Sequence, residues 1–216
     1  HAPHPRGHLP RDVLHTPDPK LLASDLPPDD WPADPELEWC PPGHGDLYTA
    51  LYASGALRAL LDAPPRHARA AHSDHPVAPA HAAIAGGSAA SGPAFAAEVA
   101  RRTPADRKGG HLVVRRSDGR LVLRETAQTP ADDQDAAADI GRHRYFNTNN
   151  LWFDLEALSA ELDRTGGVLE LPLIKNTKTV DPTDPSSPEV VQIESAMGAA
   201  VEVFAVSYTP LTLPTN

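Results

Sequence analysis

A short loop with two glycines around a histidine is the first segment whose residue types could do chemistry. It reads Pro-Pro-Gly-His-Gly-Asp over residues 41–46. Glycine lets the backbone approach a ligand through φ values that other residues resist. The loop N–H groups and the start of a following helix could then face a phosphate or a base edge. A plain turn before a helix capped by Asp46 is the alternative.

Histidines are concentrated in a second segment, residues 67–81. His67, His72, His75 and His81 lie there, with Asp74 between them. Imidazole and carboxylate groups suit zinc, iron or manganese. The spacing matches no strong metal-binding signature, so solvated loop histidines are the alternative to a metal site.

Three more segments carry polar groups at turns or strand ends. Lys108-Gly109-Gly110 supplies a cation and an open backbone, although this tripeptide is common in turns. Residues 146–152, Phe-Asn-Thr-Asn-Asn-Leu-Trp, offer three amides that suit hydrogen bonds to hydroxyls beyond the end of a strand; an Asx-turn is the alternative. Residues 175–178, Lys-Asn-Thr-Lys, place two cations beside an amide, and a solvated loop is the alternative.

Composition and absent motifs exclude several function classes. The 216 residues include 29 acidic and 19 basic side chains, a net charge of −10, which argues against a general nucleic-acid binder but not against a phosphorylated small molecule. No run approaches the roughly 18 apolar residues of a membrane span. Catalytic Gly-x-Ser-x-Gly, Cys–His and complete P-loop motifs are absent. The single cysteine, Cys40, is interpreted as structural and fits a reducing, cytoplasmic compartment.

The first third of the chain differs from the rest. Nine of the eleven histidines and fifteen of the 24 prolines lie in residues 1–81. Prolines every few residues forbid a long helix or a central strand, so residues 1–36 are expected to form an irregular surface segment. Residues 64–94 are the weakest stretch, with few large apolar side chains.

The elements expected to position these polar groups alternate between helix and strand. Apolar spacing predicts a helix over 47–61 with a break at Gly55. Asp118-Gly119 predicts a hairpin between 111–116 and 120–125, and Asp154 is a candidate cap for a helix that ends before Gly166. Strands are expected at 95–99, 145–148, 168–174 (with Pro172 marking an edge or bend) and 190–193, a loop at 181–188 and a helix within 194–204. This alternation indicates an α/β domain.

In their order, several segments resemble the UTP–glucose-1-phosphate uridylyltransferases, also called UDP-glucose pyrophosphorylases, in an actinobacterial-type form. The matching stretches are WCPPGHGDLYTAL (39–51), FAAEVARRTPADRKGGHL (95–112), LRETAQ (123–128), RYFNTNNLW (144–152), IKNTKTVD (174–181) and VVQIESAMGAAVEVF (190–204). The resemblance implies the central part of a nucleotidyltransferase, a glycosyltransferase-A-like, Rossmann-like mixed sheet with flanking helices. It places an incomplete catalytic domain at 37–204.

The resemblance also implies a reaction and a set of site residues. Glucose 1-phosphate would attack the α-phosphorus of UTP, with Mg²⁺ present, to give UDP-glucose and pyrophosphate. Gly43 and Asp74 would bind the nucleotide, and Asp74 would also hold the metal. The sugar phosphate would be bound by His44, His72, Gly109, Glu125, Asn149 and Asn176. No nucleic acid and no membrane would be involved.

Departures from the family pattern define the alternatives. His72 and His75 stand where the family has asparagines, and one base change converts an Asn, Tyr or Asp codon to a His codon. The histidine-rich block is therefore interpreted as miscalled sequence or as decay of an unused gene, rather than as a metal site. Small and polar residues in this block are also expected to weaken a buried strand, at about 2–5 kcal/mol for each large apolar residue replaced.

The ends of the sequence also depart from the family. The glycine-rich loop with its lysine and a second active-site lysine are absent from the 216 residues. The family similarity is expected to stop after Phe204. Residues 206–215 resemble a translated sequencing adapter, and 205–216 are expected to be a non-native tail, with a natural β-rich tail as the alternative. The leading hypothesis is thus an inactive central fragment of a uridylyltransferase. A non-catalytic, decayed nucleotide-sugar binder is the second hypothesis, and a histidine-based metalloprotein is the third.

Overall fold

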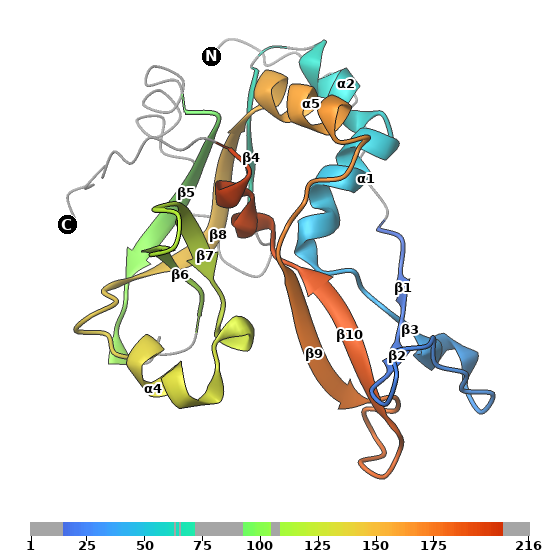
Figure 1. Ribbon diagram of the computed structural model, residues 1–216. Helices are drawn as coiled ribbons and strands as arrows, with labels where there is room; N and C mark the ends of the chain where they lie inside the picture. Colours follow the sequence, from blue (N-terminus) through green and yellow to red (C-terminus); the bar gives the residue numbers. More distant parts are fainter. Residues whose placement is uncertain (1–14, 63, 65, 72–92, 105–108, 205–216) are drawn as a thin grey trace, which may run out of the picture.

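The computed structural model describes residues 15–62, 64, 66–71, 93–104 and 109–204. Two groups of strands extend from a shared upper region that contains the main helices (Figure 1). The first group holds the sheet β4-β8-β5 and the hairpin β6-β7, and the second holds the sheet β2-β10-β9 and the pair β1-β3. Every strand pairing among the described residues is antiparallel. The α/β class is as predicted, whereas no parallel pair of the expected mixed sheet lies in this part of the chain.

The first group of strands is built on the long strand β8, which pairs with a neighbour on each side. Its members are β4 (His67–Ala70), β5 (Phe95–Arg101), β6 (His111–Val114), β7 (Leu121–Arg124) and β8 (Tyr145–Asp154). The hairpin forms around Asp118 and Gly119 as predicted, with His111 opposite Arg124 at its open end. Gly119 has φ +72°, which explains a glycine in this turn.

The second group contains shorter strands from the N-terminal part of the chain. They are β1 (Asp18–Pro19), β2 (Leu21–Leu22), β3 (Trp39–Cys40), β9 (Leu173–Thr179) and β10 (Glu189–Ser195). β2 adds to the edge of β10, and the Lys20 ammonium is buried and donates to the Val180 carbonyl at 2.9 Å. The prediction of an irregular segment over 1–36 therefore needs correction for residues 18–22, while residues 1–14 lie outside the described part.

The helices are short, and several are 3₁₀-helices. The α-helices are α1 (Leu47–Ala53), α2 (Ala56–Leu61), α4 (Gln134–Ala137) and α5 (Leu155–Arg164); the 3₁₀-helices are η1 (Pro35–Glu38), η2 (His44–Asp46), η4 (Thr126–Gln128), η5 (Ala131–Asp133) and η6 (Met197–Glu202). Gly55, with φ +77°, breaks the 47–61 helix where expected. Asp46 caps no helix N–H, because its carboxylate instead accepts a hydrogen bond from His15 at 2.8 Å.

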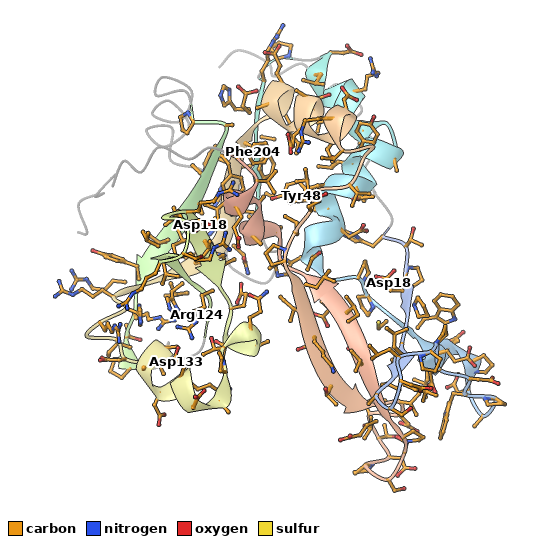
Figure 2. The ribbon with its side chains drawn as sticks, in the orientation of Figure 1. Asp18, Tyr48, Asp118, Arg124, Asp133 and Phe204 are labelled. Atoms are coloured by element: carbon orange, nitrogen blue, oxygen red, sulfur yellow. The ribbon has the colours of Figure 1, made fainter. Side chains whose placement is uncertain are left out.

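The hydrophobic core lies between β8 and the helices α1, α5 and η6. Phe95 stacks on Phe153 and on Phe204, and Tyr48 meets Phe153 edge to face. Figure 2 labels Tyr48 and Phe204 of this group. Leu155, Leu158 and Leu162 repeat at helical spacing and are buried, which fixes the inner face of α5. Four aromatic residues thus meet at one point of the core, where their large area contributes most.

Strand boundaries differ from the sequence predictions in three places. The strand expected over 168–174 begins only at Leu173, because Pro172 has no N–H for the ladder. Residues 175–178 continue that strand and are not a solvated loop. The helix expected within 194–204 is a 3₁₀-helix from Met197, since β10 extends to Ser195.

The half-buried edge strand β4, which pairs with β8, contains a polar residue whose side chain has partners. Arg69 donates to Glu98 at 3.3 Å and to Asn150 at 3.0 Å, and its guanidinium lies 5.7 Å from the centre of the Trp152 ring. Ala68 and Ala70 pack against the core on the opposite face. The face that carries Arg69 is therefore polar but paired.

The N-cap of α5 gives a direct test of this architecture. Asp154 accepts hydrogen bonds from the N–H groups of Glu156 and Ala157. We expect Asp154→Ala to lower the free energy of unfolding by about 1 kcal/mol, because two helix N–H groups lose their acceptor. Urea denaturation measures the change. Asp30→Ala, at an exposed aspartate, is the control, and an equal loss in both variants would contradict the capping role.

Candidate functional site

The glycine–histidine loop lies directly against the end of strand β10. Gly43 has φ +82° and ψ 166°, a conformation almost confined to glycine. A Cβ atom there would lie 2.6 Å from the Ser195 carbonyl oxygen and 2.8 Å from the Ser195 nitrogen. Gly45 is equally close to the Ser195 side chain, and the Ser195 N–H donates to the Pro42 carbonyl at 3.2 Å. Both glycines are therefore required for backbone-to-backbone contact with β10.

His44 is held by the first residue of η6. The Met197 N–H donates to His44 Nδ1 at 2.8 Å, so the neutral ring carries its proton on Nε2. The Met197 carbonyl in turn accepts from the hydroxyl of Tyr48, which is completely buried, at 2.7 Å. Burial raises the pKa of Tyr48 far above its usual range, so this hydroxyl stays a donor. Both backbone groups of Met197 are thus bound by side chains from the loop and from α1.

The asparagine-rich segment forms a bulge within β8 rather than a strand end. One residue of β5, Glu98, lies opposite three residues of β8, 148–150. Asn149 has φ +56°, and its N–H donates to Asn147 Oδ1 at 3.3 Å. The Asn147 amide returns a hydrogen bond to Asn149 Oδ1 at 2.8 Å. The Asx-turn interpretation is therefore correct for the backbone, and the prediction of a strand end at 145–148 was wrong, since β8 continues to Asp154.

Helix η6 connects this bulge to the histidine loop. Gly198 lies so close to the bulge that a Cβ there would be 2.7 Å from Asn147 Nδ2 and 2.8 Å from a methyl group of Leu123. η6 also contacts η2, β5, β7 and β8. The residues around His44 and around Asn149 are thus placed on either side of one short helix, although they are far apart in the sequence.

Glu125 follows β7 and packs against the glycine pair that precedes β6. A Cβ on Gly110 would lie 2.6 Å from Glu125 Oε2, so only glycine leaves room for the carboxylate. The Gly109 N–H donates to Thr126 Oγ1 at 3.3 Å. Burial raises the pKa of the Glu125 carboxyl above its ordinary value. The sequence-predicted residues Gly109 and Glu125 are therefore brought together, whereas Lys108 lies outside the described residues.

Asn176 stands apart from these groups, on strand β9. It pairs with Gln192 of β10 and is half-buried. A hydrogen bond of 3.3 Å from Gln128 of η4 to the Leu173 carbonyl links the Glu125 region to β9. The structure thus assigns Asn176 to the second group of strands, and the remaining predicted residues His72 and Asp74 lie outside the described residues.

Comparison with known proteins identifies the family of this chain. A family model described as UTP–glucose-1-phosphate uridylyltransferase matches residues 16–210. The chain belongs to that family. The match begins inside the segment 1–36 and extends six residues past Phe204, where the sequence similarity was expected to stop.

Individual uridylyltransferases give the same result. The enzyme of Saccharomyces cerevisiae is 34% identical over 187 residues, 86% of this chain and 36% of its own length. The enzyme of Hordeum vulgare is 36% identical over 77% of this chain and 33% of its own length. The chain therefore spans about a third of the length of these curated relatives.

Solved structures confirm the fold. The Trypanosoma brucei UDP-glucose phosphorylase has a TM-score of 0.85 and 42% identity, covering 89% of this chain and 41% of that one. A variant of Leishmania major UDP-glucose pyrophosphorylase, crystallised with UDP-glucose, has a TM-score of 0.81 and 41% identity, covering 89% and 42%. The described elements are thus arranged as in nucleotidyltransferases of this family.

Sequence reasoning missed the residues that support the site. Ser195, Met197 and Gly198 hold the histidine loop and the bulge in place, and Asn147 fixes the conformation of Asn149. The signal that could have found them is the group of small residues Ser195, Ala196 and Gly198. Such residues are typical of places where another backbone approaches closely, but they do not indicate which segment approaches.

No group of three or more His, Cys, Asp or Glu side chains that could hold a metal ion occurs among the described residues. Within the same residues, no helix is long and apolar enough to cross a membrane.

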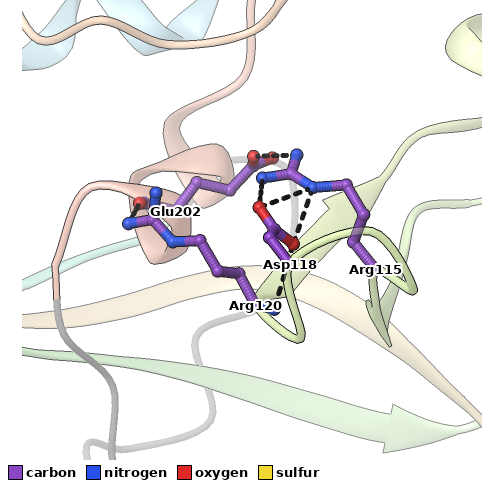
Figure 3. A network of polar contacts seen from close by, with 4 residues as sticks. All are labelled: Arg115, Asp118, Arg120 and Glu202. Atoms are coloured by element: carbon purple, nitrogen blue, oxygen red, sulfur yellow. Dashed lines mark hydrogen bonds and ion pairs between the residues drawn. The ribbon is translucent and has the colours of Figure 1, made fainter.

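A polar network fastens the hairpin to the far end of η6. Arg115 donates to Asp118 at 2.6 Å and to Glu202 Oε2 at 3.0 Å, and Arg120 donates to the Glu202 carbonyl at 2.6 Å (Figure 3). Hydrogen bonds from Arg115 are the main reason that the pKa of Asp118 falls to about 2. The network therefore holds η6 at its C-terminal end, while His44 holds it at the N-terminal end.

Alanine at Gly43 tests the loop contact, because the chain offers a matched control. Gly55 has a similar φ of +77°, but nothing lies within 4 Å of its Cβ position. We expect Gly55→Ala to cost about 1–2 kcal/mol from backbone conformation alone. Gly43→Ala should cost about 2 kcal/mol more, because Ser195 must move. Equal losses in thermal denaturation would show that the contact with β10 is not needed.

The hairpin network predicts a smaller effect. Glu202→Gln removes the charge that pairs with Arg115, and we expect a loss of about 1 kcal/mol in the free energy of unfolding that diminishes at high salt. Glu161→Gln, which breaks an ion pair within α5, is the control. Guanidinium denaturation is unsuitable because the denaturant is itself a salt, so urea is used. A loss that is unchanged by salt would rule out an electrostatic origin.

Proposed function

We propose that this chain acts as part of a uridylyltransferase that converts UTP and glucose 1-phosphate to UDP-glucose and pyrophosphate. Within that enzyme it supplies groups that hold the uridylyl and glucosyl parts of the substrate. The observation that carries the proposal is the placement of His44 and the Asn149 bulge on either side of η6, in a chain of this family.

The proposed reaction requires the protein to align two substrates and to stabilise negative charge. An oxygen of glucose 1-phosphate attacks the α-phosphorus of UTP, a new P–O bond forms, and the bond to pyrophosphate breaks. Catalysis of such a step depends on alignment of the two substrates and on stabilisation of negative charge. Residues held rigidly by buried contacts suit this task, because their hydrogen bonds need no rearrangement.

Each proposed role follows from the chemistry of a described group. Gly43, whose Cβ side is filled by Ser195, would contact the uridine through its backbone. His44, with its proton on Nε2, would donate to an oxygen of the sugar phosphate. The carboxylate of Glu125 would accept from two sugar hydroxyls, with Gly109, Asn149 and Asn176 lining the remainder. The proposed roles of His72 in sugar-phosphate binding and Asp74 in nucleotide binding concern residues outside the described part.

The proposal also includes a bound Mg²⁺ ion. When bound, it would neutralise charge on the triphosphate. Asp74 is the proposed ligand, and the described residues form no cluster that could replace it. The roles given above to His44, Glu125 and Asn149 do not depend on the metal.

A non-catalytic nucleotide-sugar binder is the second candidate, and one observation favours it. His72 and His75 stand where the family resemblance leads us to expect asparagines. Loss of a single charge-stabilising donor costs about 10²–10³ in rate. Both candidates predict that this chain binds UDP-glucose, and only turnover separates them.

Calorimetry with UDP-glucose tests the shared prediction. We expect Glu125→Gln to weaken binding about tenfold or more, because a charge-assisted hydrogen bond becomes a neutral one. Glu170→Gln, at an exposed carboxylate, should leave the affinity unchanged. No heat of binding with the folded, unmutated chain would overturn the proposal. Formation of UDP-glucose from UTP and glucose 1-phosphate would exclude the non-catalytic alternative.

The pH dependence of binding provides an independent test. Since burial raises the pKa of Glu125, this carboxyl takes up a proton at a higher pH than an ordinary glutamate. Affinity for UDP-glucose should therefore begin to fall above the usual glutamate range as the pH is lowered. Glu125→Gln should remove this part of the profile. A wild-type profile that matches that of the variant would exclude Glu125 as the titrating group.

We also place the protein in the cytoplasm. The buried thiol of Cys40 is free, as expected in a reducing compartment. Fractionation of the source cells with an antibody to this chain tests the location.

A further inference from the structure

A recess of about 520 Å³ lies on the hairpin side of the molecule. Its lining includes none of the described residues that are proposed to bind the substrate. β6, β7, η5, α4 and the turn before β8 each contribute to its wall. The lining residues are Val113, Val114, Arg116, Arg124, Asp133, Ala136, Arg142 and His143. Its volume is within the range of sites that hold small molecules.

The charge of this recess is opposite to that of the chain. Three guanidinium groups line it, against one carboxylate, in a protein with a net charge of −10. Arg124 forms an ion pair with Asp133, and Figure 2 shows the two labelled residues close to each other. Among the described residues, Arg116 and Arg142 have no acidic partner within 4 Å. Within the part of the chain that the structure describes, two guanidinium groups at the wall of a concave surface thus have no ion-pair partner.

Two histidine rings and one guanidinium lie at and behind the wall. The ring of His143 packs on the ring of His111, with 4.2 Å between their centres. Arg102 donates to the Gly109 carbonyl at 2.6 Å, and its guanidinium lies 3.4 Å from His111 Nδ1. The His111 Nε2 is buried and has no hydrogen-bond partner among the described residues. Arg102 thus adds N–H donors and no acceptor to this layer.

Electrostatics agree with this geometry. Burial and the neighbouring His143, Arg102 and Arg124 lower the pKa of His111 to about 4. Burial and the charges of Arg142, Arg102 and Arg124 also lower the pKa of His143. A site that disfavours additional protons in this way favours an anion.

We propose that the recess binds a small phosphorylated anion through Arg116, Arg124 and Arg142. Guanidinium groups present paired N–H donors that match the oxygens of a phosphate. Val113, Val114 and Ala136 add an apolar wall that suits a small organic group carrying the phosphate. The anion is either free phosphate or a phosphate monoester, and the two share the same anchoring chemistry.

Titration of the full chain by ¹H–¹⁵N NMR tests the proposal with two probes, inorganic phosphate and glycerol 3-phosphate. Either probe should shift the ring resonances of His143. Tighter binding of the monoester would identify a phosphorylated metabolite as the natural class, and equal binding would identify the free anion. No shift at His143 up to millimolar concentrations of both probes would overturn the proposal.

Charge-matched variants separate this site from diffuse attraction. Arg116→Gln with Arg142→Gln should weaken binding about tenfold or more, because two charge-assisted contacts are lost. Arg58→Gln with Arg164→Gln removes the same charge from exposed positions on α2 and α5 and should leave affinity within about twofold. Asp133→Asn should tighten binding, since it removes the one carboxylate among the described residues that line the recess. Equal losses in both double variants would overturn the proposal.

Competition with UDP-glucose distinguishes the recess from the proposed substrate site. Saturating UDP-glucose should leave the affinity for inorganic phosphate unchanged. Displacement of phosphate by UDP-glucose would assign the anion to the substrate site and overturn a separate site. A chain that binds phosphate but not UDP-glucose would retain this inference while the proposed function fails.

Discussion

The backbone of Met197 is the point on which the described structure depends. Its N–H is bound by an imidazole from the histidine loop and its carbonyl by a buried phenol from α1. A buried backbone group without a partner costs about 1–3 kcal/mol, so each of these contacts matters. Because Met197 begins η6, the same two hydrogen bonds determine where the strand β10 ends and where the helix meets β8. Met197 thus links the histidine loop to the first group of strands, in addition to the hydrogen bond from Gln128 to the Leu173 carbonyl.

Close contacts at four glycines also hold the candidate site together. Gly43 and Gly45 bring one loop onto Ser195, Gly198 brings η6 onto Asn147, and Gly110 leaves space for Glu125. In each case the absent side chain allows a polar group to approach a backbone. The candidate site is therefore shaped less by its polar residues than by the glycines beside them. This explains why the polar residues alone, met in sequence, suggested turns and solvated loops as readily as a ligand.

Local features of the fold could be predicted from the sequence. The hairpin at Asp118-Gly119, the cap at Asp154 and the break at Gly55 each depend on residues a few positions apart. The bulge at Asn149 could not be predicted, because it depends on pairing between β8 and β5. Asp46 had the right position for a cap, but its carboxylate is bound to His15, thirty-one residues away. Of the site, the motifs were found from the sequence, whereas their supports Ser195, Met197 and Gly198 required the tertiary structure.

The contact between His44 and Met197 also sets an order of events during synthesis. It joins residues 153 positions apart, and closing so long a loop is slow compared with forming a local hairpin. The β6-β7 hairpin needs only a short loop and can close as soon as it leaves the ribosome. The histidine loop, made early, has no β10 and no η6 to bind until about 150 more residues have been added. The first motif of the site is thus among the last to acquire its native contacts, and during translation it is exposed to chaperones and proteases for longer than any part of the hairpin.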